Sequence, residues 1–312
     1  MKYKSFRLFY LLTFLLLGLI PLLALLFNDG SMDFDAIADK ASKATGLVWT
    51  SNLLVVLRLI AYEPLLLLLL FGSLVPAIAA ILTLAFSKKD RKWLDFFGRL
   101  HPVRNGKWLP ALGVYGEIFV LMLLGLLVTL GLRRLTGGDY AWSENLLAWQ
   151  LIPSILVIAF LDQGAILEEL GWRGFATPEL QDKGINPFRV ALVIGICWGL
   201  WHVPRDVTTG VIERLGWVSY VLLYLPSFLL GTITVSIIAS YYMNKLGGSV
   251  VPPIVVHGIT NDAIGLSGAA SIVEALTPYH QITRAIPFAV IAFMLWRRSG
   301  NQLNFRAKFV DD

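Results

Sequence analysis

The chain has 312 residues; 56% are hydrophobic, only 15% are charged, and the net charge is +5. A soluble domain carries about 25% charged residues, so the composition excludes an ordinary soluble protein. It predicts an all-α, polytopic membrane bundle, because helices satisfy their own backbone hydrogen bonds in lipid. The basic residues stand in short clusters beside apolar runs, a pattern that sets membrane orientation and gives no reason to expect nucleic acid as a partner.

Apolar runs along the chain predict about eight transmembrane helices, since about 20 residues cross the hydrocarbon core. In chain order, the expected spans are residues 8–28, 64–87, 108–132, 145–161, 190–204, 215–244, 247–261 and beyond, and 282–296. Whether residues 45–62 also span the membrane is left open. We expect N-terminal helices and a basic loop over 1–135, a catalytic membrane core over 136–300, and a short charged tail over 301–312.

The distribution of Lys and Arg predicts the orientation of the chain. Eight spans put both termini on one side, and most of the 26 basic residues, including all those of loop 88–107, then fall on that side. By the positive-inside rule this side is cytoplasmic. The compact chain fits a bacterial plasma membrane, with the lipid bilayer as its surroundings.

Three charged residues follow the fourth expected span, in the segment Ile166–Phe175. Glu169 and Arg173 are four residues apart, so in a helix they form a pair on one face with the acid first. Glu168 is rotated by about 100° from Glu169 and is left free for chemistry. Because each intramembrane charge costs roughly 2.5–3.5 kcal/mol on insertion scales, a cluster of charges indicates a functional site.

Two histidines occur in other expected spans. His202 ends the fifth span one helical turn after Trp198, and His257 lies in the seventh span with Asn261 four residues later on the same face. Intramembrane polar groups must find partners, so we expect these residues to meet the acidic pair. His101 and His280 are expected in loops and receive no functional role.

The ordered set Glu168–Glu169–x–x–x–Arg173, Trp198–x–x–x–His202 and His257–x–x–x–Asn261 resembles the motifs of the CAAX-protease and bacteriocin-processing (CPBP) family. Its members are intramembrane proteases related to the prenyl-protein type II CAAX endopeptidase. The resemblance covers residues 163–266. One departure is Trp198, where the family usually has Phe, and we expect it to affect packing rather than chemistry.

The resemblance implies an endopeptidase acting on a membrane-associated or lipidated peptide or protein. Glu168 and His202 would hold and deprotonate a water molecule, and Arg173 would orient the acidic pair through Glu169. His257 and Asn261 would donate hydrogen bonds to the oxyanion. The favoured scheme requires no cofactor. Zinc or another divalent metal remains an alternative, because Glu168, His202 and His257 would make a sufficient ligand set.

Two other function classes remain open on the sequence. The same fold could serve as a non-catalytic immunity or scaffold protein that binds a peptide or partner without using Glu168. A small-solute transporter with Glu117 and Glu168 in a proton path is the third reading. The two halves of the chain show no paired broken spans of the kind that transporters often carry.

Overall fold

The structure is a computed structural model that describes residues 3–28, 34–47, 51–87, 90–104, 106–137, 155, 157, 159–266 and 276–306. Every regular element in these ranges is helical, which confirms the all-α prediction. The elements are α1 Lys4–Leu17, α2 Leu19–Asn28, α3 Phe34–Thr45, α4 Leu53–Ile60, α5 Leu66–Ser87, α6 Asp90–Gly98, α7 Trp108–Leu135, α9 Gln163–Gly171, η2 Trp172–Ala176, α10 Thr177–Gln181, α11 Pro187–Trp201, α12 Val203–Thr208, α13 Val211–Leu215, α14 Trp217–Ser219, η3 Tyr220–Tyr224, α15 Leu225–Lys245, α16 Val251–Leu266, α18 Pro278–Ser299 and η4 Gly300–Gln302.

Five segments of the described chain are long and apolar enough to cross a membrane, at Lys4–Leu23, Leu66–Phe86, Trp108–Leu135, Pro187–Val207 and Trp217–Lys245. They coincide with five of the eight expected spans, so a multi-pass membrane protein is confirmed and the count of eight is not. The expected span at 145–161 lies largely outside the described residues. The stretch 45–62 holds α4, whose 8 residues rise only about 12 Å and are too short to span.

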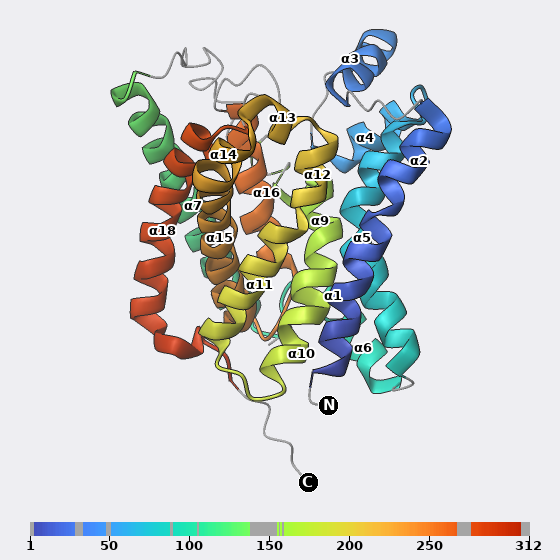
Figure 1. Cartoon of the computed structure of the whole chain (residues 1–312). Helices are drawn as coiled ribbons and strands as arrows, with labels where there is room; N and C mark the ends of the chain where they lie inside the picture. Colours follow the sequence, from blue (N-terminus) through green and yellow to red (C-terminus); the bar gives the residue numbers. More distant parts are fainter. Residues whose placement is uncertain are drawn as a thin grey trace.

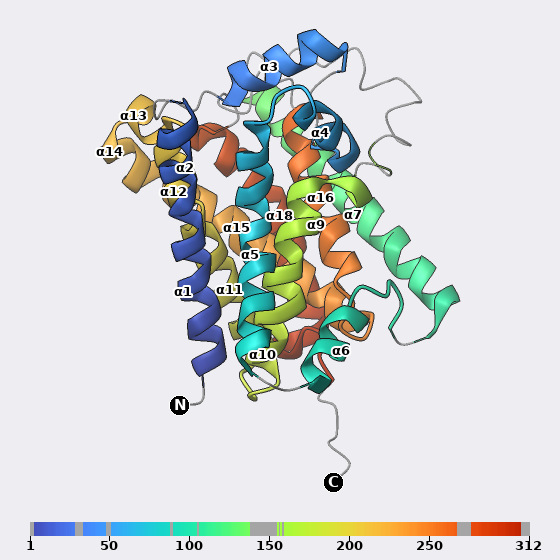
Figure 2. The ribbon, with the colours of Figure 1, turned by 90° about the vertical axis from the view of Figure 1, so that its right-hand side faces the viewer.

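The helices form one bundle with α15 near its centre (Figures 1 and 2). Helix α15 packs against α18, α11 and α16, while α9 packs between α5 and α16. Helix α1 lies along α5 on the outside of the bundle. This arrangement brings the three predicted motifs together, because α9, α11 and α16 are neighbours in space although they are distant in sequence.

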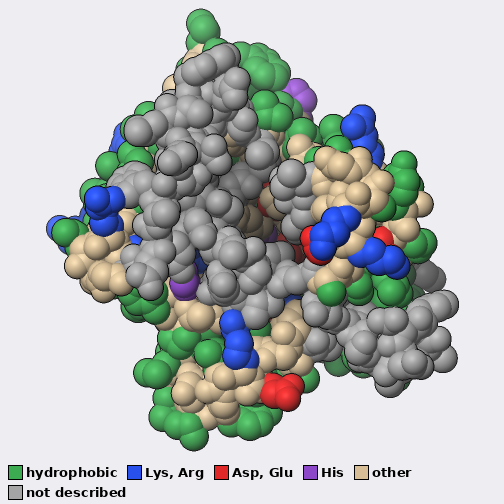
Figure 3. All heavy atoms as spheres, turned by 90° about the horizontal axis from the view of Figure 1, so that it is seen from above, with side chains coloured by type: hydrophobic (Ala, Val, Ile, Leu, Met, Phe, Trp, Pro, Cys, Tyr) green, Lys and Arg blue, Asp and Glu red, His purple; other side chains and the backbone are tan. Residues whose placement is uncertain are grey.

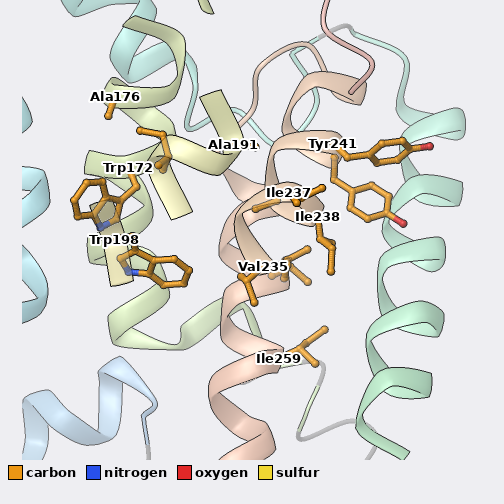
Figure 4. Close-up of a cluster of buried hydrophobic side chains, with 14 of the residues drawn as sticks. Trp172, Ala176, Ala191, Trp198, Val235, Ile237, Ile238, Tyr241 and Ile259 are labelled. Atoms are coloured by element: carbon orange, nitrogen blue, oxygen red, sulfur yellow. The ribbon is translucent and has the colours of Figure 1, made fainter. Parts of the chain in front are cut away.

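Aromatic and branched side chains fill the space between α11, α15 and α16 (Figure 4). Trp172 and Trp198 lie at one side of this cluster, and Val235, Ile237 and Ile238 of α15 form its middle. Glycine allows the closest approaches. A Cβ added to Gly258 of α16 would lie 2.5 Å from the Ala159 carbonyl oxygen, a separation that only a residue without a side chain permits.

The outer surface of the bundle is apolar. Leucine, valine and phenylalanine side chains stay exposed along the long helices, for example Leu112, Val120 and Leu127 on α7. Seen from the end that carries α3, hydrophobic side chains gather around the rim of the molecule (Figure 3). An apolar belt of this kind suits contact with lipid chains rather than water.

Charged clusters tie the helix ends to one another. Glu117 of α7 binds Lys245 at 2.6 Å and Arg298 at 2.7 Å, one through each carboxylate oxygen. This pairing gives Glu117 a structural role and leaves it unsuited to the proton path of the transporter reading. At the same end, Glu179 of α10 binds Lys92 and Lys183.

Candidate active site

A buried aspartate starts the helix that carries the acidic motif. Asp162 has extended backbone angles, and its carboxylate accepts a 2.6 Å hydrogen bond from the Ala165 backbone N–H, which makes it the N-cap of α9. The cap fixes where α9 begins. Glu168 and Glu169 then lie one and a half turns further on, inside the bundle.

The helix widens just after the two glutamates. Residues Trp172–Ala176 form a π-helical turn, and the Thr177 hydroxyl donates to the Trp172 carbonyl oxygen at 2.9 Å. Single π turns are rare and are frequent at functional sites. Arg173 lies in this turn and is fully buried. The sequence predicted an ordinary helix here and gave no sign of the wider turn.

Glu169 is held by two basic groups. Its Oε1 accepts a 2.7 Å hydrogen bond from Arg173 Nη1 and lies 3.0 Å from Nδ1 of His257. All three side chains are buried. The predicted pair between Glu169 and Arg173 is therefore present, and the structure adds His257 as a third member. A buried carboxylate needs such compensation, which makes Glu169 an anchoring residue.

Glu168 has a different neighbour. Its Oε2 accepts a 2.8 Å hydrogen bond from Nε1 of Trp198, which is its hydrogen-bond partner among the described residues. The Trp198 ring also lies 4.8 Å from the Arg173 guanidinium carbon and 4.8 Å from the His257 ring. Trp198 therefore touches all three motifs. The contact goes beyond the packing role expected for this position, because phenylalanine has no N–H to donate to Glu168.

His202 is oriented by the backbone of α11. Its Nδ1 lies 2.8 Å from the Trp198 carbonyl oxygen. A carbonyl oxygen only accepts, so Nδ1 carries the hydrogen and Nε2 of the neutral ring keeps a lone pair. The ring is wedged between Trp201 and Phe228, with centroid distances of 4.8 and 5.2 Å. The His202 ring is thus held by one hydrogen bond and two aromatic contacts.

Asn261 is joined to the start of the acidic helix. Its Nδ2 donates to Oδ1 of Asp162 at 3.1 Å, and an amide nitrogen has a second hydrogen to donate. A Cβ built on Gly164 would lie 3.5 Å from this nitrogen and 3.6 Å from Oε1 of Glu168. The amide and the free carboxylate oxygen therefore flank the same glycine.

A pocket of about 80 Å³ opens beside these residues and is lined by His202, His257, Asn261, Trp198, Arg205 and Arg284, among others. This volume holds more than one water molecule. Neither glutamate belongs to the pocket lining. Glu168 is connected to the pocket through two neighbours. It is hydrogen-bonded to Trp198, which lines the cavity together with His257. Its Oε1 also lies beside Gly164, and so does the amide of Asn261, which faces the cavity.

The proposed metal ligands are not gathered as a ligand set. Within the part of the chain that the structure describes, no group of three or more His, Cys, Asp or Glu side chains is close enough to hold one ion. His257 directs Nδ1 at Glu169, and Glu168 is bound to Trp198. These bonds use Oε2 of Glu168 and Nδ1 of His257 and do not involve Oε1 of Glu168 or Nε2 of the histidines, so the metal alternative stays a hypothesis that chelation tests.

The structure also shows residues that the sequence pattern missed. Asp162 follows the fourth expected span and received no role from the sequence, although its N-cap position and its bond to Asn261 place it in the site. Arg205 and Arg284 line the pocket, and the sequence gave no motif around them. His280, expected in a loop, lies buried in the first turn of α18. The signal that could have found these residues is that each is an ionisable group beside an apolar run.

The fold and the site define a polytopic, all-α membrane protein with a buried centre of acids, histidines and an amide around one pocket. Residues 144–262 match the family model described as "Rce1-like: Type II CAAX prenyl endopeptidase Rce1-like". The chain is also 27% identical over 203 residues to a protein named CAAX prenyl protease 2 from Methanococcus maripaludis, a match that covers 62% of this chain and 70% of the relative.

These two matches and the membrane fold support a membrane endopeptidase of the CAAX-protease and bacteriocin-processing family. The matched residues 144–262 contain all six predicted site residues, from Glu168 to Asn261.

Proposed function

We propose that the protein hydrolyses a peptide bond in a prenylated peptide or protein held in the membrane, using a water molecule activated by Glu168 and His202. The observation that carries this proposal is the division of labour between the two glutamates. Glu169 is fully buried, and Arg173 and His257 both bind its Oε1. Glu168 keeps Oε1 beside Gly164 and Asn261.

The two proposed bases are held by opposite ends of Trp198. The indole N–H binds the Glu168 carboxylate, and the carbonyl oxygen of the same residue binds the His202 ring. A water molecule between Glu168 and Nε2 of His202 would lose a proton to the carboxylate as its oxygen attacks the scissile carbonyl carbon. The same proton would pass to the leaving amine nitrogen when the carbon–nitrogen bond breaks, which is general acid–base catalysis.

The oxyanion that forms during the attack needs hydrogen-bond donors. Asn261 has one amide hydrogen left after binding Asp162, and His257 lines the same pocket one helical turn away. Fixed donors of this kind contribute about 2.7–4 kcal/mol each in other hydrolases. Arg173 stabilises the arrangement through Glu169 and acts as a positioning residue.

The substrate class follows from the relative's name and from the lipid environment. The C-terminal Cys-a-a-X sequence is the signal for prenylation of its cysteine, and the relative is named as a CAAX prenyl protease. A prenyl chain would lie in the lipid beside the bundle while the peptide enters the pocket. A bacteriocin leader or a peptide pheromone is the alternative substrate for the same chemistry.

Purified protein in detergent, incubated with a farnesylated Cys-a-a-X peptide, tests the proposal. Glu168→Gln should reduce kcat by at least 100-fold, because the base is lost while the side-chain volume is kept. Glu213→Gln is the matched control, since Glu213 is exposed on α13. A chelator should leave the wild-type rate unchanged. Full activity of Glu168→Gln would refute Glu168 as the base, absence of cleavage by the wild type would favour the non-catalytic reading, and loss of activity with the chelator would favour a metal.

A further inference from the structure

An arginine stands in the wall of the pocket that the proposed chemistry does not use. Arg284 of α18 lines the same cavity as His202, His257 and Asn261. One arm of its guanidinium, Nη2, donates a 2.7 Å hydrogen bond to Oε1 of Gln281, one turn earlier on the same helix. Gln281 thereby orients the guanidinium, whose other N–H groups make no hydrogen bond within the part of the chain that the structure describes.

The facing helix leaves space for this arginine. Gly231 of α15 lines the pocket as well, and a Cβ built on it would lie 3.8 Å from Nη2 of Arg284. Gly231 has no side chain to cover the guanidinium, so Arg284 faces the cavity at this point of α15.

Two other arginines near the pocket each bind an acidic side chain, and Arg284 has no such partner among the described residues. Arg205, the second arginine of the pocket, binds Asp206 at 2.6 Å. Arg173 binds Glu169 at 2.7 Å. Among the described residues, no carboxylate lies within 4.0 Å of Arg284, and its hydrogen-bond partner Gln281 is neutral.

Arg284 is half-buried, and a cation taken partly out of water with no acidic partner among the described residues is costly; such residues in membrane proteins mark binding sites for charged groups. The planar fork of a guanidinium matches a carboxylate with two parallel hydrogen bonds. We propose that Arg284 is a specificity residue that binds a carboxylate of the substrate close to the scissile bond. This inference rests on the proposed peptide hydrolysis in the same pocket.

A peptide can supply that carboxylate from two sources, its C-terminus or an acidic side chain. The test therefore uses four farnesylated Cys-a-a-X peptides, in which X is Gln or Glu and the C-terminus is a free acid or a carboxamide. The wild type should cleave the fully neutral peptide roughly 10–100-fold less efficiently, in kcat/KM, than the preferred acidic one, the range expected for one hydrogen-bonded charge pair. The peptide that restores cleavage identifies the source.

Arg284→Gln should lower kcat/KM for the acidic peptides to the level of the neutral peptide and leave the neutral peptide's rate unchanged. An unchanged rate on the neutral peptide also shows that the variant is folded. Arg284→Lys keeps the charge but loses the planar guanidinium. Its kcat/KM for the acidic peptides should therefore lie between the values of the wild type and of Arg284→Gln. Arg297→Gln is the matched control, because Arg297 is exposed in the last turn of the same helix.

Cleavage of all four peptides at equal rates by the wild type would overturn the inference while leaving the proposed function intact. An equal loss on all four peptides in Arg284→Gln would overturn it as well, since a structural defect does not distinguish charges. If the wild type cleaves none of the four, the proposed hydrolysis of prenylated peptides fails, and the role of Arg284 fails with it.

Discussion

Trp198 connects the three motifs at the scale of single residues. Its N–H binds Glu168, its carbonyl oxygen binds His202, and its ring packs on His257. One rigid side chain therefore fixes both proposed bases relative to the pocket. Precise orientation of a base is worth orders of magnitude in rate, and a hydrogen bond to a charged group is worth about 1.5–3 kcal/mol.

Trp198→Phe should lower kcat about tenfold, because the ring remains while the hydrogen bond that orients Glu168 is lost. Trp201→Phe is the matched control. Trp201 is the next tryptophan on α11, it contacts the His202 ring, and its own N–H has no hydrogen-bond partner in the described structure. Steady-state kinetics on the same peptide compare the two variants. Equal losses in both would show that the Trp198 hydrogen bond has no role in orienting Glu168.

Helix contacts hold these residues in place at the scale of elements. Helix α9 crosses α5 at Gly171, where a Cβ would lie 2.5 Å from the Pro76 backbone carbonyl carbon and oxygen. This contact joins the acidic helix to the second apolar span. The π turn follows immediately after Gly171, so any shift of α9 against α5 would move Arg173 and Glu169.

Gly171→Ala should destabilise the protein by about 1–3 kcal/mol, the usual cost of overpacking, and should reduce activity by moving the acidic pair. Thermal unfolding in detergent and peptide cleavage measure the two effects. Gly113→Ala in α7 is the control, because a Cβ there meets nothing within 4 Å and alanine favours a helix. Equal unfolding temperatures for both variants would contradict the close contact.

The connection between α6 and α10 depends on pH. Burial raises the pKa of Glu179, but hydrogen bonds and charge interactions with Lys183 and Lys92 outweigh it and lower the pKa below its usual value. A carboxyl group whose pKa is lowered by folding stabilises the protein above its unfolded pKa of about 4.3. That stabilisation is lost as the pH falls through the lower folded pKa.

Glu179→Gln should therefore destabilise the protein by about 1 kcal/mol at pH 7, a typical value for a partly exposed ion pair. The difference from wild type should shrink as the pH falls below about 4. Unfolding curves at several pH values, with Glu213→Gln as a control, provide the measurement. A difference that stays constant with pH would show that the Glu179 ion pairs do not contribute.

The two described ends of the chain lie at the same end of the whole molecule. Helix α1 begins there and α18 ends there, whereas α13 lies at the opposite end (Figure 1). The basic residues near both chain ends predict that this side faces the cytoplasm. The cytoplasmic location of the termini is thus a proposal that rests on charge distribution, and the plasma-membrane location is one that rests on the compact size of the chain.

Cysteine labelling tests this orientation in a Cys197→Ser background. A membrane-impermeant maleimide added to intact cells should label Glu213→Cys and should not label Lys4→Cys or Arg297→Cys, all three being exposed positions. After permeabilisation all three should react. Different labelling of Lys4→Cys and Arg297→Cys in intact cells would mean that the two ends lie on opposite sides of the membrane.

The sequence by itself determined the all-α membrane class, the resemblance to the family and the pairing of Glu169 with Arg173, because composition, apolar run length and four-residue spacing are properties of short segments. The tertiary structure alone decided the rest. The hydrogen bond from Trp198 to Glu168, the link from Asp162 to Asn261 and the place of Arg284 in the pocket wall each join residues of helices far apart in sequence. Which faces of those helices meet is set by close packing at glycines such as Gly171 and Gly258, and no local pattern encodes such contacts.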